Sequence, residues 1–298
     1  EIGSGLVGSE MCIRDRLYYA CKEENKKIYE IALDNEASNG EYTEYRVRLQ
    51  AKKSLDAMKE AVKAGLSSTE PSPSGMSGDD CNKLQKRFEK YPSILGSTAE
   101  KILTYALATS EQNLRMGTIV ACPTAGSCGI VPAVLIAFAE DNNISESEQI
   151  NALITAGEVG RLVANKMALA GAVGGCQAEC GVASAMASAA LTQMRGGNVK
   201  QIINAVTLAL KNIMGLTCDP VCGLVEIPCV KRNPFLAIHA VTASELAMAD
   251  IISKIPIDEV VDAMEQTGQL MSPLLKESSQ GGLAKTKTAA ALEKNILK

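Results

Sequence analysis

Seven of the ten cysteines gather in three short segments that contain glycine and proline. They are Cys122 and Cys128 in ACPTAGSC, Cys176 and Cys180 in CQAEC, and Cys218, Cys222 and Cys229 in CDPVCGLVEIPC. Glycine lets backbone N–H groups approach an anion or a cluster sulfur, and turns let neighbouring thiolates converge. Cysteine is also a small apolar residue that is often buried, so packing is the alternative interpretation for any one of these thiols.

The spacing of the cysteines narrows the kind of metal site. Structural zinc sites favour two CxxC knuckles and ferredoxins carry a CxxCxxC run, and neither pattern occurs in the sequence. What remains is a site assembled from distant thiolates, one from CQAEC and two from CDPVCGLVEIPC. Three thiolates leave one metal position open for a substrate. The spacing leaves open which cysteine of the first segment, and which two of the second, are ligands.

The chain has a single histidine, His239. One imidazole disfavours a His-rich zinc site, a Ser-His-Asp triad and haem held by two histidines. His239 lies in the largely apolar stretch FLAIHAVTASELAMAD, so we interpret it as a structural residue rather than a catalytic base. Cys21 and Cys81 stand apart in polar stretches, and we assign them no role.

Composition excludes several classes of function. The chain has 298 residues, 46% hydrophobic and 21% charged, with a formal net charge of −4. Mild acidity and an aromatic content of 3% argue against nucleic-acid binding. The uncharged stretch 116–139 is long enough to span a membrane, but Pro123 and Gly126 interrupt it. We therefore expect a buried loop followed by a buried helix, and no membrane segment.

No secretory signal is visible in the sequence. We therefore expect a cytoplasmic protein, in a reducing compartment where metal ligation by cysteine outranks disulfide formation.

Most of the segments that must position these residues show the apolar spacing of an α-helix. Helices are predicted over 17–37 (one or two), 41–65, 80–88, 97–114, 130–139, 151–170, 177–194, 199–214, 234–252 and 258–271. Gly65 is expected to stop the 41–65 helix, and Asp79 or Asp80 to cap the helix after the Ser/Pro/Gly loop 67–80. The sequence thus predicts an all-α fold, a compact globular bundle of small-residue-rich helices with Gly/Pro loops converging on the cysteine site.

Three long motifs carry a resemblance to a known family. The runs ACPTAGSCGIVPAVL, GAVGGCQAECGVASAMASAAL and GLTCDPVCGLVEIPCVKRN resemble the alpha chain of the bacterial iron–sulfur L-serine dehydratases, and the shorter SGMSGDDCNKL and KESSQGGLA fit the same family. The resemblance covers about residues 17–284 in order. It implies L-serine as substrate and a [4Fe-4S] cluster without PLP, held by Cys176, Cys218 and Cys229, with one iron open for the substrate.

The resemblance also implies where the substrate binds. It points to Thr124 and Ser127 in PTAGS, where Ala125 replaces an asparagine that single-chain relatives often carry, and to Ser77 in SGMSGDD. The general base is not assignable from the sequence, although Glu179 and Glu226 stand near the ligands and could carry a proton. Further residues that could surround the cluster are Asn212, Arg232 and Asn233.

Three regions are expected along the chain. Residues 1–16 are similar to translated sequencing-adapter fragments, so we predict that they are non-native. Residues 17–75 are expected to form an N-terminal helical region and linker, and residues 76–298 a helical catalytic domain with the cluster-binding cysteines. Single-chain relatives carry an additional N-terminal domain with a PSSSHT-type motif, which is absent here. A separate beta chain is therefore the expected partner, beside L-serine.

Two other functions would also use these cysteine thiolates. A non-catalytic iron–sulfur or metal-binding redox module would keep the cysteines without the substrate loop. A related cysteine lyase would keep the loop and act on L-cysteine. An anaerobic assay that compares L-serine with L-cysteine distinguishes these alternatives from the dehydratase.

Overall fold

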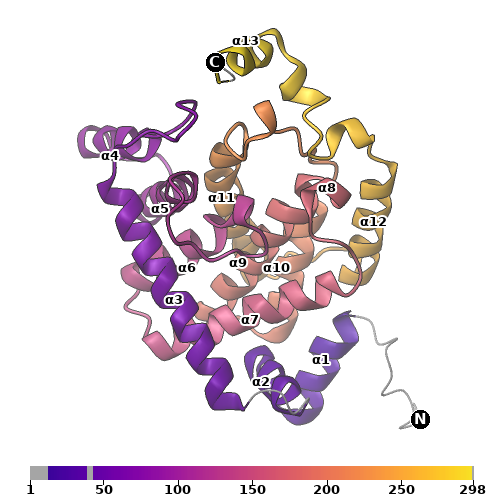
Figure 1. The fold of residues 1–298 in the computed structure, drawn as a ribbon. Helices are drawn as coiled ribbons and strands as arrows, with labels where there is room; N and C mark the ends of the chain where they lie inside the picture. Colours follow the sequence, from indigo (N-terminus) through magenta and orange to yellow (C-terminus); the bar gives the residue numbers. More distant parts are fainter. Residues whose placement is uncertain (1–12, 39–42, 297–298) are drawn as a thin grey trace.

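The computed structural model describes residues 13–38 and 43–296, and this part of the chain is all-α, as the sequence predicts (Figure 1). Its α-helices are α1 (Ile13–Glu24), α2 (Ile28–Ser38), α3 (Glu44–Ser67), α4 (Asp80–Lys90), α5 (Ser97–Leu114), α6 (Ile130–Asp141), α7 (Glu146–Ala164), α8 (Gly171–Gly174), α9 (Val182–Met194), α10 (Val199–Lys211), α11 (Cys229–Met248), α12 (Ile257–Leu270) and α13 (Lys287–Ile296). Short turns join some of them: η1 (Ala125–Ser127), η2 (Gln177–Gly181), η3 (Val221–Gly223), η4 (Pro273–Leu275) and η5 (Gly282–Lys285). None of the described helices is both long and apolar enough to cross a membrane.

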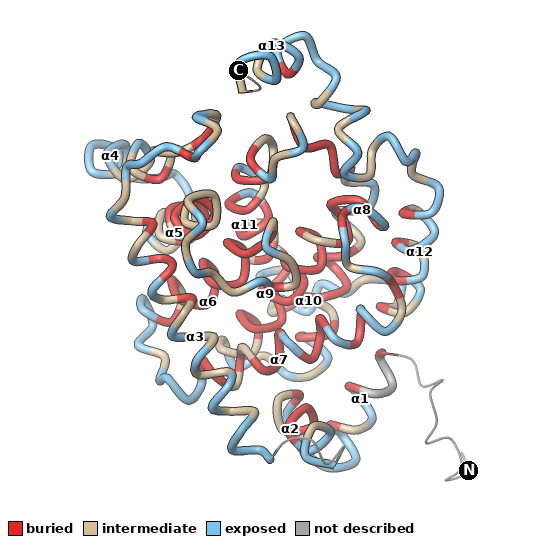
Figure 2. Tube along the Cα trace, viewed as in Figure 1, coloured by how far each residue is buried: buried red, intermediate tan, exposed pale blue. Residues whose placement is uncertain are grey.

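Helix α9 lies at the centre, with α6, α7, α10 and α11 packed around it (Figures 1 and 2). Every residue from Val182 to Thr192 is buried. The helix can be enclosed because its sequence, VASAMASAALTQM, is mainly alanine and serine, whose small side chains let neighbouring helices approach. Its buried hydroxyls are paired: Ser184 Oγ donates to the Leu236 carbonyl over 2.9 Å, and Thr192 Oγ1 donates to Ser244 Oγ over 2.9 Å.

Helix α3 packs closely against α5, and Gly65 makes this possible. A Cβ at Gly65 would lie 2.1 Å from the Ala108 carbonyl oxygen of α5. The prediction that Gly65 stops the helix is wrong, because α3 continues to Ser67. The glycine allows close approach of two helices rather than marking a helix end.

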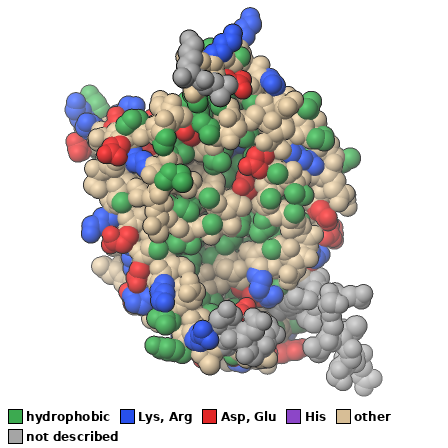
Figure 3. Space-filling view, in the orientation of Figure 1, with side chains coloured by type: hydrophobic (Ala, Val, Ile, Leu, Met, Phe, Trp, Pro, Cys, Tyr) green, Lys and Arg blue, Asp and Glu red, His purple; other side chains and the backbone are tan. Residues whose placement is uncertain are grey.

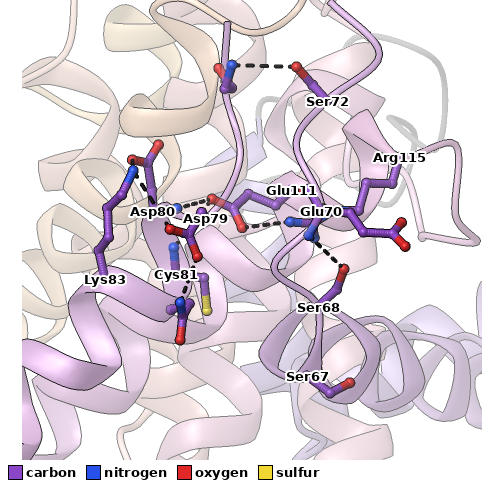
Figure 4. Close-up of polar contacts among 12 residues, drawn as sticks. Ser67, Ser68, Glu70, Ser72, Asp79, Asp80, Cys81, Lys83, Glu111 and Arg115 are labelled. Atoms are coloured by element: carbon purple, nitrogen blue, oxygen red, sulfur yellow. Dashed lines mark hydrogen bonds and ion pairs between the residues drawn. The ribbon is translucent and has the colours of Figure 1, made fainter. Parts of the chain in front are cut away.

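The cap of α4 also differs from the prediction. Asp79 is the N-cap residue but makes no capping bond; its carboxylate accepts a bond from Asn82 Nδ2 instead. The carboxylate of Glu111, from α5, accepts the N–H groups of Asp80 and Cys81 over 2.7 and 3.2 Å (Figure 4). A residue 30 positions away thus satisfies the start of this helix.

Two helices begin earlier than predicted. Helix α7 begins at Glu146 rather than 151, because Ser145 and Glu148 form a capping box there. Helix α11 begins at Cys229 rather than 234, and it accommodates Pro234 within its second turn. The earlier start makes Cys229 the first residue of a long helix.

The N-terminal helices share the core of the molecule. Residues 1–12, most of the segment predicted to be non-native, lie outside the described residues. Helix α1 begins at Ile13, whose side chain is buried and whose N–H donates to Asp258 Oδ1 over 2.7 Å. Buried side chains of α1, α2 and α3 belong to the same hydrophobic cluster as those of α9. The division at residues 75 and 76 remains a prediction.

Candidate active site

Four buried cysteines form one group near the start of α11, which we call the thiol group: Cys176, Cys180, Cys218 and Cys229. The thiols of Cys176 and Cys180 lie close enough to shift each other's pKa. Cys218 and Cys229 lie close enough for their charges to interact with each other and with Cys176. The structure therefore brings together two cysteine segments that are about 40 residues apart in sequence, and it adds Cys180 to the three predicted ligands.

Cys176 is positioned by a tight turn and a buried glutamine. Gly175, just before it, has a φ of +75°, and a Cβ there would lie 2.9 Å from the Leu216 carbonyl oxygen, so the position requires glycine. Gln177, fully buried, donates to the Met264 carbonyl over 2.8 Å and accepts the Gly215 N–H over 2.9 Å. The π-helical turn η2 then leads into α9, and such turns are frequent at functional sites.

Cys218 is held by the segment that follows α12. Its N–H donates to the Leu275 carbonyl over 2.8 Å, and its carbonyl accepts the Glu277 N–H over 2.6 Å. The next residue, Asp219, is buried and accepts the Leu283 N–H over 2.8 Å. The segment KESSQGGLA, whose resemblance to the family was weak, therefore contacts the backbone of Cys218 and the side chain of Asp219 and helps to position the thiol group.

Arg232 joins two parts of the thiol group. Its guanidinium donates to Asp219 Oδ1 and to the Thr217 carbonyl, each over 2.8 Å, and it lies close enough to the Cys176 thiol to lower the pKa of that thiol. A buried cation beside several thiols favours their ionised form. The prediction that Arg232 lies near the cysteines is confirmed in its geometry.

Asn233 fixes the PTAGS segment to α11. Its Nδ2 donates to the carbonyls of Gly126 and Cys229 over 2.9 and 3.0 Å, and its Oδ1 accepts the Gly129 N–H over 2.9 Å. The other flanking residue named from the sequence, Asn212, is not at this site. Its side chain bonds the Leu208 carbonyl at the end of α10.

Thr124 and Ser127 lie together in η1 and its N-cap, facing Glu179. The two hydroxyl oxygens are 3.2 Å apart. The Thr124 side chain lies close enough to the Glu179 carboxyl to affect its pKa, and Glu179 Oε2 lies 4.0 Å from Cys218 Sγ. The structure therefore puts the predicted substrate loop, one carboxyl group and the thiol group side by side.

The pKa values of the thiols and of the Glu179 carboxyl at this site differ from their usual values. The neighbouring Cys180 thiol lowers the pKa of Cys176 against the effect of burial, and Arg232 adds to the lowering. Burial raises the pKa of Cys229 to about 12 and also raises the pKa of Cys218. Burial raises the pKa of Glu179 above its usual value. Cys176 is thus the thiol most ready to ionise.

The donor set fits an iron–sulfur cluster better than a single ion. Thiolates are soft ligands that select zinc, copper(I) or iron–sulfur clusters. Among the described residues, no three His, Cys, Asp or Glu side chains converge closely enough to hold one metal ion. Each thiolate of a [4Fe-4S] cluster binds a different iron, so its ligands need not converge on one point. Gly171 leaves further room, since a Cβ there would lie 2.9 Å from Cys218 Sγ.

Ser77 is connected to this site only through other serines of its loop. It lies in the 67–80 loop, whose Ser72 and Ser74 donate to the buried Glu226 over 2.8 and 2.7 Å. Glu226 stands three residues before Cys229, so these bonds attach the loop to the cysteine segment. The Ser77 hydroxyl is buried and has no hydrogen-bond partner in the described part of the chain. An unpaired buried hydroxyl is costly, which is consistent with a bound ligand as its partner.

The other cysteines in the described part of the chain lie outside the thiol group. Cys122 and Cys128 are buried, and their thiols contact the Val120 and Thr109 carbonyls. Cys222 is partly exposed, in η3. Cys21 and Cys81 are buried in the helical core, although they stand in polar stretches of the sequence. The cause is helix packing, which hides one face of a polar-looking stretch.

His239 contacts α9 rather than the thiol group. Its Nδ1 lies 2.8 Å from Ser184 Oγ, and burial lowers its pKa. This contact is consistent with the structural role expected from the sequence. Two residues that shape the site gave no clear signal in the sequence: Gln177 and Glu111 are buried through contacts with distant segments.

The comparisons with known proteins agree with the motifs. The family model described as "Serine dehydratase alpha chain" matches residues 23–284. The chain is 45% identical over 275 residues to a "Probable L-serine dehydratase, alpha chain" of Bacillus subtilis, covering 92% of this chain and 91% of that one. It is 39% identical to the "L-serine dehydratase, alpha chain" of Peptoniphilus asaccharolyticus, covering 93% and 95%. It is 35% identical to an "L-serine dehydratase" of Helicobacter pylori, covering 96% of this chain and 64% of that longer protein.

Proposed function

The chain belongs to the serine dehydratase alpha-chain family, and on that basis we propose that it is the alpha chain of an L-serine ammonia-lyase. The reaction removes the α-proton and the β-hydroxyl of L-serine as water. The resulting aminoacrylate tautomerises and hydrolyses to pyruvate and ammonia. The proposal rests on the names of the relatives together with the thiol group beside Thr124.

In this proposal Cys176, Cys218 and Cys229 hold a [4Fe-4S] cluster, and no PLP takes part. When bound, such a cluster supplies a Lewis-acidic iron for the departing hydroxide. The grouping of these three buried thiols, with Arg232 beside Cys176, supports the ligand set. Cys180 then acts through its effect on the neighbouring Cys176 thiol rather than as a ligand.

The chain's own residues bind L-serine and handle the proton. Thr124 and Ser127 supply adjacent hydroxyls for the carboxylate or ammonium group, and Ser77 supplies a further hydroxyl from the 67–80 loop. Glu179 contacts both Thr124 and Cys218, so it is the carboxyl group placed to exchange a proton with a bound substrate. Glu226 is engaged by two serine hydroxyls and serves to hold the loop.

We also propose that a separate beta chain completes the enzyme and that the protein is cytoplasmic. The description of the family and of its relatives as alpha chains supports a partner. Apolar side chains form much of the middle of the face shown in Figure 3. Met116, Val173 and Val225 are exposed at 87%, 55% and 37% on segments bordering the thiol group and the PTAGS segment, where a partner could cover them.

An anaerobic assay tests the proposed function. The chain, purified without oxygen and mixed with its beta chain, is given L-serine or L-cysteine without added pyridoxal phosphate. We expect pyruvate from L-serine in at least about ten-fold preference, on the general scale by which a site built for a hydroxyl rejects its analogues. Preference for L-cysteine would favour the cysteine lyase. No turnover of either, with the metal retained, would favour a redox module.

A further inference from the structure

A cavity of about 680 Å³ lies between α3, α7 and the segment that leads to the PTAGS turn. Its walls are mainly apolar, and Met58, Leu153, Ile154 and Met186 contribute side chains from three helices. This volume falls in the range of small-molecule sites, about 300–1,000 Å³. The cavity is separate from the thiol group and has no part in the function proposed above.

Gly157 keeps the cavity open. It lies inside α7, where glycine is less favourable than alanine, and a Cβ at this position would meet no atom within 4 Å. Gly160, one turn later, differs, because Met186 Sδ would lie 2.9 Å from a Cβ there. Packing therefore requires the small residue at Gly160 and not at Gly157, where a side chain would only enter the cavity.

Charged side chains of both signs border the cavity: Arg46, Lys53 and Arg161, with Glu36 and Glu158. Glu158 binds Arg161 through two bonds of 2.8 and 2.6 Å, so this pair neutralises itself. Lys53 is an exposed residue at the cavity and, within the ranges described by the structure, makes no ion pair or hydrogen bond, so its ammonium group is open to a bound anion.

From the apolar walls, the open space at Gly157 and the uncompensated Lys53, we propose that this cavity binds a small apolar monocarboxylate. The apolar body lies against Met58, Ile154 and Met186, and the carboxylate reaches Lys53. The cavity wall includes Val120, Ala121, Cys122 and Pro123, and Thr124 follows directly. A bound acid therefore contacts the far side of the segment that carries Thr124 and Ser127.

The fluorescent acid 8-anilinonaphthalene-1-sulfonate is a suitable probe, because it joins an apolar ring system to a single anionic group. We expect saturable binding of one probe per full-length chain. Octanoate should compete with it, and octylamine, which has the same chain with a cationic end, should compete at least about ten-fold less well. Equal competition by the two would contradict the proposed charge preference.

Substitutions locate the probe. Gly157→Leu fills the cavity and should weaken probe binding at least about ten-fold, while far-UV circular dichroism stays unchanged. If that variant does not fold, Ala51→Leu fills the same cavity from the α3 side. Lys53→Gln should weaken binding about three-fold, and Lys52→Gln should not, because that adjacent lysine already has carboxylate partners. Unchanged binding in a folded cavity-filling variant, or equal effects of the two lysine variants, would overturn the proposal.

Discussion

Glu179 is the residue that links the two halves of the site. Its carboxyl contacts the Thr124 hydroxyl on one side and lies 4.0 Å from Cys218 Sγ on the other. A carboxyl in this place can exchange a proton with a substrate bound at the PTAGS turn without itself holding the metal. Its role should therefore be separable from metal retention.

Glu179→Gln should lower serine turnover about a hundred-fold and leave the iron content unchanged. The amide keeps the size of the side chain but cannot exchange the proton, and loss of a positioned acid or base costs about 10²–10⁴ in rate. Pyruvate formation and iron are measured on the same preparation. Glu89→Gln is the control, because that exposed carboxylate lies in α4. Turnover at the wild-type rate in Glu179→Gln would remove Glu179 from the mechanism.

His239 gives a direct test of burial because it is the only histidine in the chain. Burial lowers its pKa below 6.5 in the folded protein, so the unfolded chain binds the proton more tightly. The stability that His239 contributes is therefore complete above about pH 6.5 and is lost as the pH falls through the lower folded pKa.

Urea unfolding at several pH values measures this effect. The free energy of unfolding of the wild-type chain, relative to His239→Gln, should fall between about pH 7 and pH 5. The glutamine side chain of that variant does not titrate, so the difference isolates the histidine from the carboxylates. A difference that stays constant over this range would contradict the burial of His239.

The elements around the site are held by polar contacts between distant parts of the chain. The carboxylate of Glu111, fully buried in α5, accepts two N–H groups at the start of α4 and binds Arg115 over 3.2 Å (Figure 4). Arg115 in turn donates to the Glu70 carbonyl in the 67–80 loop over 2.7 Å. This network fixes the loop that carries Ser72, Ser74 and Ser77.

Glu111→Ala should destabilise the chain by about 3 kcal/mol, because it leaves a buried Arg115 and two N–H groups without their partner. Chemical denaturation gives the free energy of unfolding. Glu60→Ala removes an exposed carboxylate from the neighbouring α3 and should change the stability by less than about 0.5 kcal/mol. Equal effects of the two substitutions would show that the network does not hold the loop.

Local sequence patterns predicted which segments are helical better than they predicted the residues at which each helix begins and ends. Apolar periodicity identified α3, α5, α6, α9 and α10 because these helices bury one or more faces. It missed the start of α11 at Cys229, since a proline at 234 resembles a helix start. Glycine at 65 resembles a stop, while its actual partner, Ala108, lies in a different helix.

The site was predictable only in part for the same reason. The cysteine pattern located the cysteine segments, and the family resemblance pointed to Thr124 and Ser127, whose substrate role stays a prediction. No local pattern indicates that Glu226 binds Ser72 and Ser74, or that the 272–285 segment backs Cys218. Such contacts depend on the packing of whole helices, which a single sequence does not display.

At the scale of the whole molecule, we expect the proposed beta chain to be required for serine turnover but not for assembly of the cluster. Val173→Asp puts a charge on an exposed apolar position of α8 beside the thiol group, where it should weaken binding of the beta chain and lower turnover at least about ten-fold. The iron content should not change. Ile94→Asp, a fully exposed residue before α5, is the control. If both variants turn over L-serine like the wild type, the partner binds elsewhere.

The central claim is that Cys176, Cys218 and Cys229 hold a [4Fe-4S] cluster. The most direct test measures iron and acid-labile sulfide per chain in anaerobically purified wild type, Cys218→Ala and Cys222→Ala. We expect about four irons per chain, as that cluster type requires, in the wild type and in Cys222→Ala. Cys218→Ala should lose the iron, because two thiolates hold a cluster poorly. Iron retained in Cys218→Ala but lost in Cys222→Ala would contradict the ligand assignment.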